Sequence, residues 1–530
     1  MALTASSDAR SAQRFDSVAT TAILAALVCA APPFAVMLFA LTTASEASFG
    51  GDLLREGAFG TLALVAVGGG GATILGALAA WLVTLCQFPG RALFAWLLAI
   101  PLAAPSYVLS YCYSTLTWAG GPSPIEVSGF WGLAFIYAVG LYPYVYLSAR
   151  AAFVSQSASA LEAARTLGAR PWSVFRRVAL PLARPSIAAG AALAMMEIAA
   201  DFGAADHFGQ TTLSTAIFRA WYGHGAPALA LQISAVLLAA AVAFLAIERW
   251  ARGRASYSGG STRSNSLPRY RLSWFVGFIA ALFCAVLVLL GALLPLAWLV
   301  RLALLHPHLG DVVRPLLNSL LLAGGGSLIT LVLAAAIAVA ARRGRALGKA
   351  ALYAAGMGYA APGAVIALGA IAVFGVARAA GLVGGLAAPL AITALLWTYA
   401  ARFAAAGVQP IDAGLARLSK GVDASARTLG AGPWRRVARV DLPIAAPSLA
   451  AAALIVFVEI LKELPATLIL RPFDFDTLAV NAYAYASDER VLQAAAPALL
   501  VFLVGLAPIL VLTRGMVRTR AGFRADRNRL

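Results

Sequence analysis

Four carboxylates lie inside stretches that are otherwise apolar. Glu197 and Asp201 belong to "MMEIAADFG", and Glu459 and Glu463 belong to "FVEILKELP", at a constant shift of 262 residues. Within each pair the two residues are one helical turn apart on one face. An ionised carboxylate in a bilayer core costs roughly 2.5 to 3.5 kcal/mol, so it usually faces a partner or a wet pathway. Because hard cations prefer oxygen ligands, we expect the four to be transient metal ligands along a transport pathway.

A structural role for these carboxylates is the alternative. Lys462 can pair with Glu459 at a spacing of three, and Asp201 or Glu463 can bind backbone groups freed where Gly203 and Pro465 break the helix. The first pair has no lysine in its segment, which leaves like charges four residues apart. Both interpretations stay open at the level of sequence.

The surrounding composition is that of an integral membrane protein. Of 530 residues, 61% are hydrophobic and 12% are charged, which excludes a water-soluble globular protein. The net charge of +18 comes mostly from arginines in short segments between apolar runs, where the positive-inside rule explains them without nucleic acid. The four cysteines lie in apolar runs without metal-ligand spacing, so we expect no bound cofactor.

Twelve apolar stretches are long enough to cross a membrane, at about 20 residues each. They lie at about 18–42, 59–86, 92–118, 130–150, 185–204, 228–247, 273–301, 317–341, 350–376, 385–408, 447–466 and 493–513. Arginines concentrate in alternate connections and in the C-terminal tail, whereas most acidic residues fall in the others. We therefore predict an all-α, multi-pass protein of the bacterial inner membrane with both termini in the cytoplasm.

The chain divides into two repeats in the same orientation. Residues 249–272 are rich in Gly, Ser and Arg and read as a flexible cytoplasmic linker between a first half, 1–248, and a second half, 273–530. "ARTLGA" at 164 returns at 426, and a weaker echo pairs "AAPSYVLS" at 103 with "AAPGAVIA" at 360. Twelve helices thus form two parallel six-helix repeats.

A polar segment recurs between the fourth and fifth spans of each half, as "LEAARTLGARPW" and "ASARTLGAGPW". The first copy predicts a helix over 157–167, a left-handed turn at Gly168, and a second helix from Pro171 to about Ala179. One such segment is typical of a helix lying on a membrane surface. Two copies in register favour a shared function in the cytoplasm.

These segments resemble the coupling loop of binding-protein-dependent ABC importer permeases, and the chain is similar to a fused pair with the MetI-like fold. The resemblance implies that each helix-turn-helix coupling loop docks on a cytoplasmic ABC ATPase, two copies in all, and that a soluble binding protein delivers substrate outside. The residues that match the loop are Glu162, Ala163, Ala164 and Gly168, then Ala424, Ser425, Ala426 and Gly430. The second loop lacks the acidic residue, with Asp423 one position earlier.

The chain is expected to be a transport permease without enzyme activity. It has no GxxxxGK[ST] phosphate loop, so ATP is used by the partner ATPase. "KELPATLILRPFDFDTLAV" at 462 and "ADFG" resemble the ferric iron branch, which implies Fe(III) as substrate; thiamine, polyamine and phosphonate are the alternatives. A twelve-span secondary transporter is the alternative class, but its motif would lie between spans two and three of each half.

Acidic residues of the outer connections are candidates for docking the binding protein, with a solvated acidic rim as the alternative. They are Asp474, Asp476, Asp488 and Glu489. The histidines near these connections, including His207, are expected to be solvated.

Overall fold

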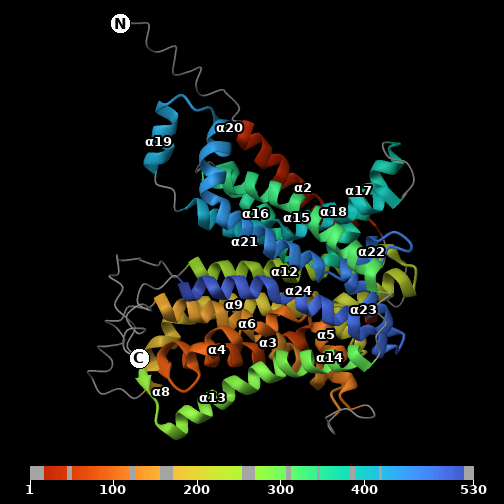
Figure 1. The fold of residues 1–530 in the computed structure, drawn as a ribbon. Coiled ribbons are helices and arrows are strands. Elements are labelled where there is room, and N and C mark those ends of the chain that lie inside the picture. Colours follow the sequence, from red (N-terminus) through yellow and green to blue (C-terminus); the bar gives the residue numbers. More distant parts are fainter. Residues whose placement is uncertain are drawn as a thin grey trace. The chain divides into compact units, whose positions relative to one another are not determined.

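The computed structural model describes residues 17–43, 50–117, 126–155, 171–253, 269–305, 312–342, 346–381, 388–416 and 420–518. Within these ranges the chain is almost wholly helical (Figure 1). Ten helices are long and apolar enough to cross a membrane, and two bent helix pairs raise the number to as many as twelve. An all-α membrane architecture was therefore predicted correctly.

The long helices are α2 (Ser17–Thr42), α3 (Gly50–Leu85), α6 (Gly129–Ser155), α9 (Leu180–Ala200), α12 (Pro227–Gly253), α13 (Trp274–Val288), α14 (Leu294–Leu305), α15 (Val313–Arg342), α16 (Ala346–Ala360), α17 (Gly363–Ala379), α18 (Ala388–Leu415), α21 (Leu442–Leu461) and α24 (Val491–Arg518). The short helices are α4 (Arg91–Leu97), η1 (Ile100–Ala103), α5 (Ser106–Thr115), α8 (Pro171–Val174), α10 (Gly203–His207), α11 (Leu213–Phe218), α19 (Lys420–Thr428), α20 (Pro433–Arg436), α22 (Pro465–Leu470) and α23 (Leu478–Ser487). The described residues also contain four π-helical segments: η2 (Phe175–Ala179), η3 (Arg219–Gly223), η4 (Leu289–Leu293) and η6 (Val437–Asp441). Two residues of β1 (Cys86–Gln87) pair in parallel with β2 (Tyr270–Arg271).

The helices group into two compact units that do not coincide with the two sequence repeats. One unit holds residues 1–39, 320–461 and 469–473, and the other holds residues 40–319, 462–468 and 474–530. The first unit therefore contains α2 from the first repeat together with α15 to α21 from the second. The second unit contains the first repeat's α3 to α12 together with α13 and α14, the first span of the second repeat, and with α23 and α24, which include its last span. Residues 254–268 of the linker lie outside the described residues, so the linker boundary stays a prediction.

In the first unit, α2 packs through small side chains. Cys29 is buried in one apolar cluster with Ile337, Ala355 and Val408 from three other helices. Gly369 leaves room for the backbone of Pro32, where an added Cβ would collide. Absent side chains let membrane helices approach closely, so this contact depends on glycine.

A proline inside α2 also frees a carbonyl group that another helix binds. Pro32 has no N–H, so the carbonyl of Val28, four residues earlier, lacks its intrahelical donor. Trp397 Nε1 of α18 donates to this oxygen at 2.8 Å. An unpaired carbonyl is costly in a membrane, so the tryptophan supplies a contact that the proline makes necessary.

The first span of the second repeat shows the reciprocal arrangement in the other unit. With π-helical spacing, the Leu290 carbonyl would point to the N–H of residue 295, which is a proline. Tyr113 of α5 donates its hydroxyl to this oxygen at 2.6 Å. Close by, Trp298 Nε1 donates to Thr115 Oγ1 at 2.9 Å. In both units, a side chain from one repeat satisfies a carbonyl in the first span of the other.

The third span of each repeat is a bent helix pair and not the single helix expected at 92–118 and 350–376. The segments 91–103 and 106–115 meet at 91°, and 350–360 and 363–379 meet at 112°. Each break falls at the Ala-Pro of the repeated "AAP", at Pro105 and Pro362. A proline disfavours the helical conformation at the residue before it, and Ala104 is accordingly extended, with φ −87° and ψ 116°.

Three of the π-helical segments end two residues before a proline. They are η2 before Pro181, η4 before Pro295 and η6 before Pro443. A wide turn gives space to the carbonyl that the proline ring would otherwise strike. The helix predicted to end near Ala179 therefore does not end there, and it continues through η2 into α9.

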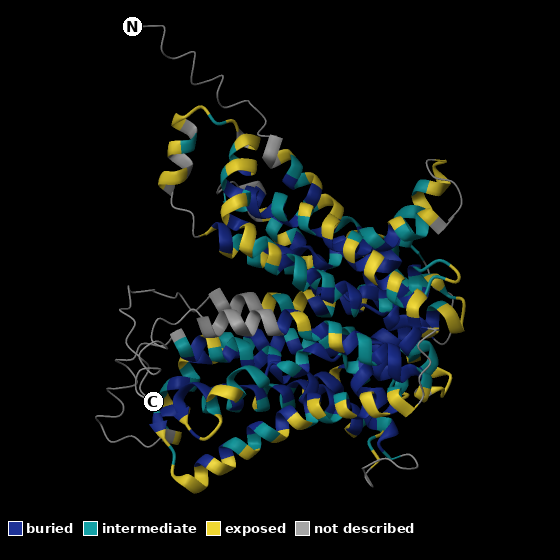
Figure 2. Cartoon of the chain, viewed as in Figure 1, coloured by how far each residue is buried: buried dark blue, intermediate teal, exposed yellow. Residues whose placement is uncertain are grey.

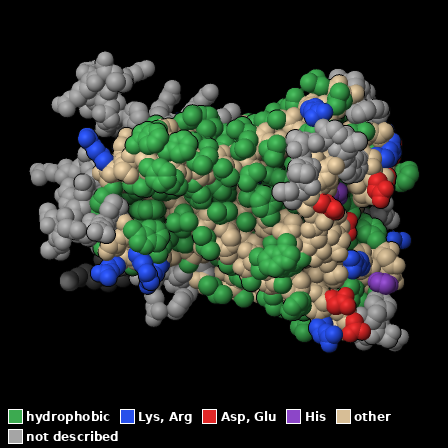
Figure 3. All heavy atoms as spheres, turned by 90° about the horizontal axis from the view of Figure 1, so that it is seen from below, with side chains coloured by type: hydrophobic (Ala, Val, Ile, Leu, Met, Phe, Trp, Pro, Cys, Tyr) green, Lys and Arg blue, Asp and Glu red, His purple; other side chains and the backbone are tan. Residues whose placement is uncertain are grey.

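Exposed apolar side chains run along the outer helices, as Figure 2 shows in yellow along α13. On α13 they are Trp274, Phe275, Val276, Phe278, Ile279, Leu282 and Val286. On the face drawn in Figure 3, hydrophobic side chains cover the middle, while acidic and histidine side chains gather at one end, together with Lys and Arg. The charged side chains visible at the other end are Lys and Arg. This distribution is typical of a protein with a membrane-embedded middle.

Candidate functional site

The two repeated polar segments are called the coupling segments here, after the loop that they resemble. The second one forms the predicted helix-turn-helix. Helix α19 contains Ala424, Ser425 and Ala426, and the chain turns at Gly430 with φ 74° before α20. The N–H of Leu429 donates to the Ser425 carbonyl, and the N–H of Ala431 to the Ala426 carbonyl. A left-handed residue just after the last turn is a common helix terminator, and glycine adopts it without strain.

This segment presents apolar side chains to its surroundings. Leu429 is 84% exposed and Trp434 is 52% exposed, although both belong to a polar connection. Ser425 and Thr428 are exposed on α19 as well. Exposed leucine and tryptophan side chains on a short helical hairpin are suited to burial against another protein.

Part of the first coupling segment is described. Glu162, Ala163, Ala164 and Gly168 lie outside the described residues, which resume at Pro171. From there, Trp172 and Phe175 pack on Trp81 of α3, with ring centroids 5.6 and 4.6 Å apart. The first segment is thus attached to the membrane helices by an aromatic cluster.

The second segment is attached by an ion pair instead. Arg342, at the end of α15, approaches Asp441 of η6 with 3.5 Å between Nη1 and Oδ1, and the side chains are 18% and 8% exposed. The residue equivalent to Asp441 in the first repeat is Ala179, and the equivalent of Phe175 is Val437. The two segments therefore join the membrane helices through different chemistry.

Two of the four predicted pathway carboxylates bind backbone at the ends of short helices. Asp201 Oδ1 accepts the Ala204 N–H of α10 at 2.8 Å. Glu463 accepts the N–H groups of Ala466 and Thr467 of α22, each at 3.1 Å. These are the contacts expected from the structural alternative, and they occupy equivalent places in the two repeats.

The other two lie one turn earlier, half-buried in α9 and α21: Glu197 and Glu459. Among the described residues, no three His, Cys, Asp or Glu side chains converge to hold a metal ion. The role of the four carboxylates as transient metal ligands stays a prediction.

A polar cluster that the sequence did not predict surrounds Asp201. His207 is partly buried and hydrogen-bonded, Nε2 to Ser114 Oγ at 2.9 Å, where a solvated histidine was expected. The Tyr483 hydroxyl donates to Asp206 Oδ2 at 2.7 Å. The unusual run "SYVLSYCYST" of α5, polar within a predicted span, was the available signal.

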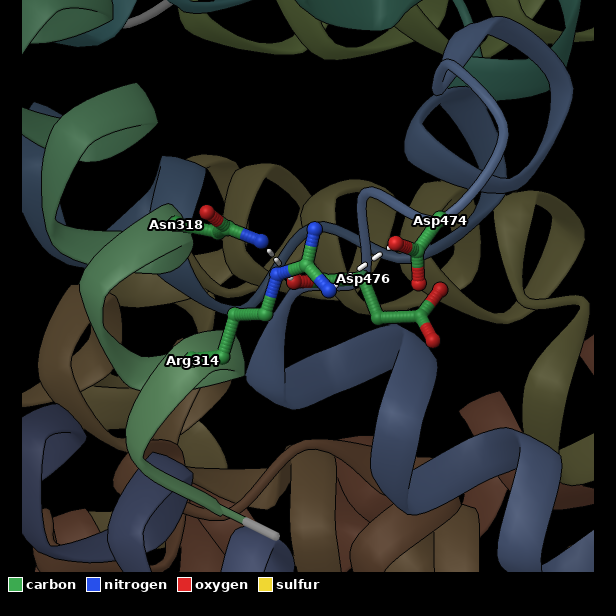
Figure 4. Close-up of polar contacts among 4 residues, drawn as sticks. All are labelled: Arg314, Asn318, Asp474 and Asp476. Carbon is green, nitrogen blue, oxygen red and sulfur yellow. Dashed lines mark hydrogen bonds and ion pairs between the residues drawn. The ribbon is translucent and has the colours of Figure 1, made fainter.

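In the connections predicted to lie outside, the acidic side chains are partly engaged by α15 (Figure 4). Arg314 Nη1 lies 2.9 Å from Asp474 Oδ2, with both side chains well exposed. Asn318 Nδ2 donates to the backbone oxygen of Asp476 at 2.9 Å, and the carboxylate of Asp476 points away from Asn318. The adjacent Phe473 is fully exposed. Docking of a binding protein on these residues stays a prediction.

Comparison with known proteins identifies the class. The pattern of the family described as "binding-protein-dependent transport system inner membrane component" matches residues 72–303 and 311–518. The two matches cover most of the chain, so this protein belongs to that family of ABC transport permeases.

Individual relatives differ in the substrate that they are named for. The chain is 26% identical to the Fe(3+)-transport system permease protein FbpB 2 of Haemophilus influenzae, over 84% of this chain and 87% of the relative. It is 30% identical to the molybdenum transport system permease protein ModB of Escherichia coli, over 32% of this chain and 81% of the relative. It is 32% identical to the sulfate transport system permease protein CysT of Escherichia coli, over 25% of this chain and 50% of the relative.

Proposed function

We propose that the chain is the permease of an ABC importer that moves ferric iron into the cytoplasm. The observation that carries the proposal is the similarity to a Fe(3+)-transport permease along 84% of this chain. That relative matches both repeats, whereas the molybdenum relative matches about one third of the chain. The acidic groups Asp201, Asp206 and Glu463 support a cation in preference to an oxyanion, which like charge would repel.

Import then proceeds by alternating access. A soluble binding protein delivers the cargo on the side of Asp474 and Asp476, and a separate ATPase binds the coupling segments on the opposite side. Two ATPase subunits would hold Glu162 and its neighbours in one segment, and Ser425 with Leu429 in the other. ATP binding and hydrolysis bias two packings of the permease, and the coupling segments transmit the change.

The charge distribution supports this orientation. Arginines such as Arg176, Arg177, Arg435 and Arg436 flank the coupling segments, which by the positive-inside rule supports a cytoplasmic position of these segments and of both termini. The acidic end seen in Figure 3 then faces the binding protein.

The experiment measures uptake of radiolabelled ferric iron by cells that lack this chain, with and without its restoration, under iron limitation. Thiamine, spermidine, phosphonate, molybdate and sulfate uptake are parallel controls. We expect restoration to raise energy-dependent uptake of iron alone. A response of another substrate would overturn ferric iron as the cargo and leave the permease family unaffected.

A further inference from the structure

Near Asp201 in the second unit, three buried tyrosine hydroxyls have no hydrogen-bond partner among the described residues. They belong to Tyr107 and Tyr111 of α5 and to Tyr137 of α6, whose residues are 5%, 2% and 0% exposed. Buried hydroxyls are almost always hydrogen-bonded to protein or to water. By contrast, Tyr113 and Tyr146 reach backbone carbonyls at 2.6 and 2.8 Å. Three unsatisfied phenols in one region therefore indicate a non-protein partner.

The three phenols share one charged neighbour. Asp201 lies within electrostatic range of Tyr107, Tyr111 and Tyr137, and Glu463 lies within range of Tyr107. The rings of Tyr107 and Tyr111 lie 5.8 Å apart, and the Tyr111 ring lies 4.8 Å from that of His207. Tyr107 also packs against Gly203, the first residue of α10, and Asp201 accepts the N–H of the next residue, Ala204.

The two tyrosines of α5 occur in one repeat only, whereas Tyr137 corresponds to Tyr399 at the shift of 262 residues. Helix α5, the second part of the broken third span, carries Ser, Tyr, Cys and Thr throughout, whereas its equivalent α17 begins "GAVIALGAIA". Tyr107 and Tyr111 correspond to Ala364 and Leu368. A stabilising role common to all broken third spans would call for the same residues twice. The difference therefore points to a ligand that the first repeat recognises.

We propose that the hydroxyls of Tyr107, Tyr111 and Tyr137, together with Asp201, enclose a hydrated chamber that binds a hard cation. The phenol oxygens supply the ligands that the acidic residues alone lack, since hard cations favour oxygen donors. Water molecules hydrogen-bond to the phenol hydroxyls when no cation is bound, because a polar pocket of this kind holds ordered water. We take this cation to be the transported ferric iron, and in this respect the proposal rests on the proposed function.

The first test uses Tyr→Phe variants of the purified full chain, since this change removes only the hydroxyl. If the phenols are hydrated, we expect the thermal midpoint of Tyr107→Phe and Tyr111→Phe to stay the same or fall. A rise in both midpoints would mean that the hydroxyls are dry and unsatisfied, and it would overturn the chamber. Tyr142→Phe is the matched control, because its hydroxyl is also buried and unpartnered but lies near Tyr146 and Cys284.

The second test titrates the same proteins with Tb(III), a hard trivalent cation whose emission is sensitised by nearby tyrosines. We expect saturable emission that Tyr107→Phe and Tyr111→Phe reduce several-fold and that Tyr142→Phe preserves. Emission that is absent, or equal in all variants, would overturn the cation site. If terbium binds as expected but cells take up no iron, the site stands and the proposed cargo fails.

Discussion

At the scale of single residues, the two capping carboxylates combine a structural contact with a place in a polar cluster. Glu463 accepts two backbone N–H groups and the Thr467 hydroxyl, the latter at 3.0 Å, and it is 5% exposed. Sequence alone left a structural and a transport role open for it. The contacts favour the first role at the start of α22 and leave the second to experiment.

Replacing Glu463 should separate the two roles. Glu463→Ala leaves buried N–H groups without an acceptor, and we expect a loss of roughly 2 kcal/mol in the free energy of unfolding. Glu463→Gln keeps one acceptor oxygen and should lose less. Thermal unfolding of the purified variants measures both losses.

Iron uptake per folded molecule is then compared between the unmodified protein and a variant in which all four carboxylates are neutralised. The changes are Glu197→Gln, Asp201→Asn, Glu459→Gln and Glu463→Gln. We expect its iron uptake to fall at least tenfold. Unchanged uptake and unchanged substrate preference would contradict a pathway role for the four groups.

Gly430 is the residue whose backbone shapes the second coupling segment. Its φ of 74° costs about 1 kcal/mol for a residue with a Cβ, while the space around it is open. We therefore expect Gly430→Ala to reduce uptake several-fold at normal protein levels, through a distorted turn. Gly432→Ala is the control, because Gly432 is also in open space but does not have a positive φ. Equal uptake by the two variants would contradict the importance of this turn.

At the scale of elements, the two coupling segments are attached differently to the membrane helices. The first uses the aromatic cluster of Trp81, Trp172 and Phe175, and the second uses Arg342 with Asp441. An aromatic contact resists salt, while an ion pair depends on both partners keeping their charge. In the proposed importer, forces from the ATPase would therefore reach the membrane helices through unequal connections.

Breaking the ion pair should impair coupling through the second segment. Asp441→Asn leaves the Arg342 charge partly buried, and we expect a loss of roughly 2 kcal/mol in stability and a several-fold fall in ATP-driven uptake. Arg439→Gln, a change of one charge at an exposed site of η6, is the control and should leave both unchanged. A double-mutant cycle with Arg342→Gln measures the interaction, and additive losses would show that the pair contributes nothing.

At the scale of the whole molecule, the first span of each repeat is bound by a side chain of the other repeat. Trp397 binds the Val28 carbonyl, and Tyr113 binds the Leu290 carbonyl. Both contacts satisfy oxygens that prolines leave without a donor. This exchange should make the two repeats interdependent in assembly.

We expect Trp397→Phe to destabilise the protein by about 1 to 2 kcal/mol, because the Val28 carbonyl loses its donor. Trp274→Phe, at an 81% exposed site, should have little effect. As a second measure, two fragments split within the linker should still co-purify when expressed together. Fragments that separate in mild detergent would contradict the interdependence of the repeats.

The sequence predicted the repeated architecture, the second helical hairpin and the turn at Gly430, because these follow from local patterns at a fixed spacing. The repeated "AAP" was an available signal for the bends at Pro105 and Pro362. The bends were not predicted, because hydropathy alone indicates a continuous span in each stretch. The tyrosine cluster around Asp201 could not be predicted, since α5, α6, α10 and α23 meet only through tertiary packing. The partner of Val28 was equally inaccessible, being 369 residues away.

That separation has a consequence in time. At about 5 to 20 residues per second, synthesis of the 369 residues between Val28 and Trp397 takes roughly 20 to 75 s. During this interval α2 is already made, but the donor for its proline-freed carbonyl does not yet exist. The Val28 carbonyl of the nascent span therefore needs a temporary hydrogen-bond donor, such as water or a group of the insertion machinery, until Trp397 is in place.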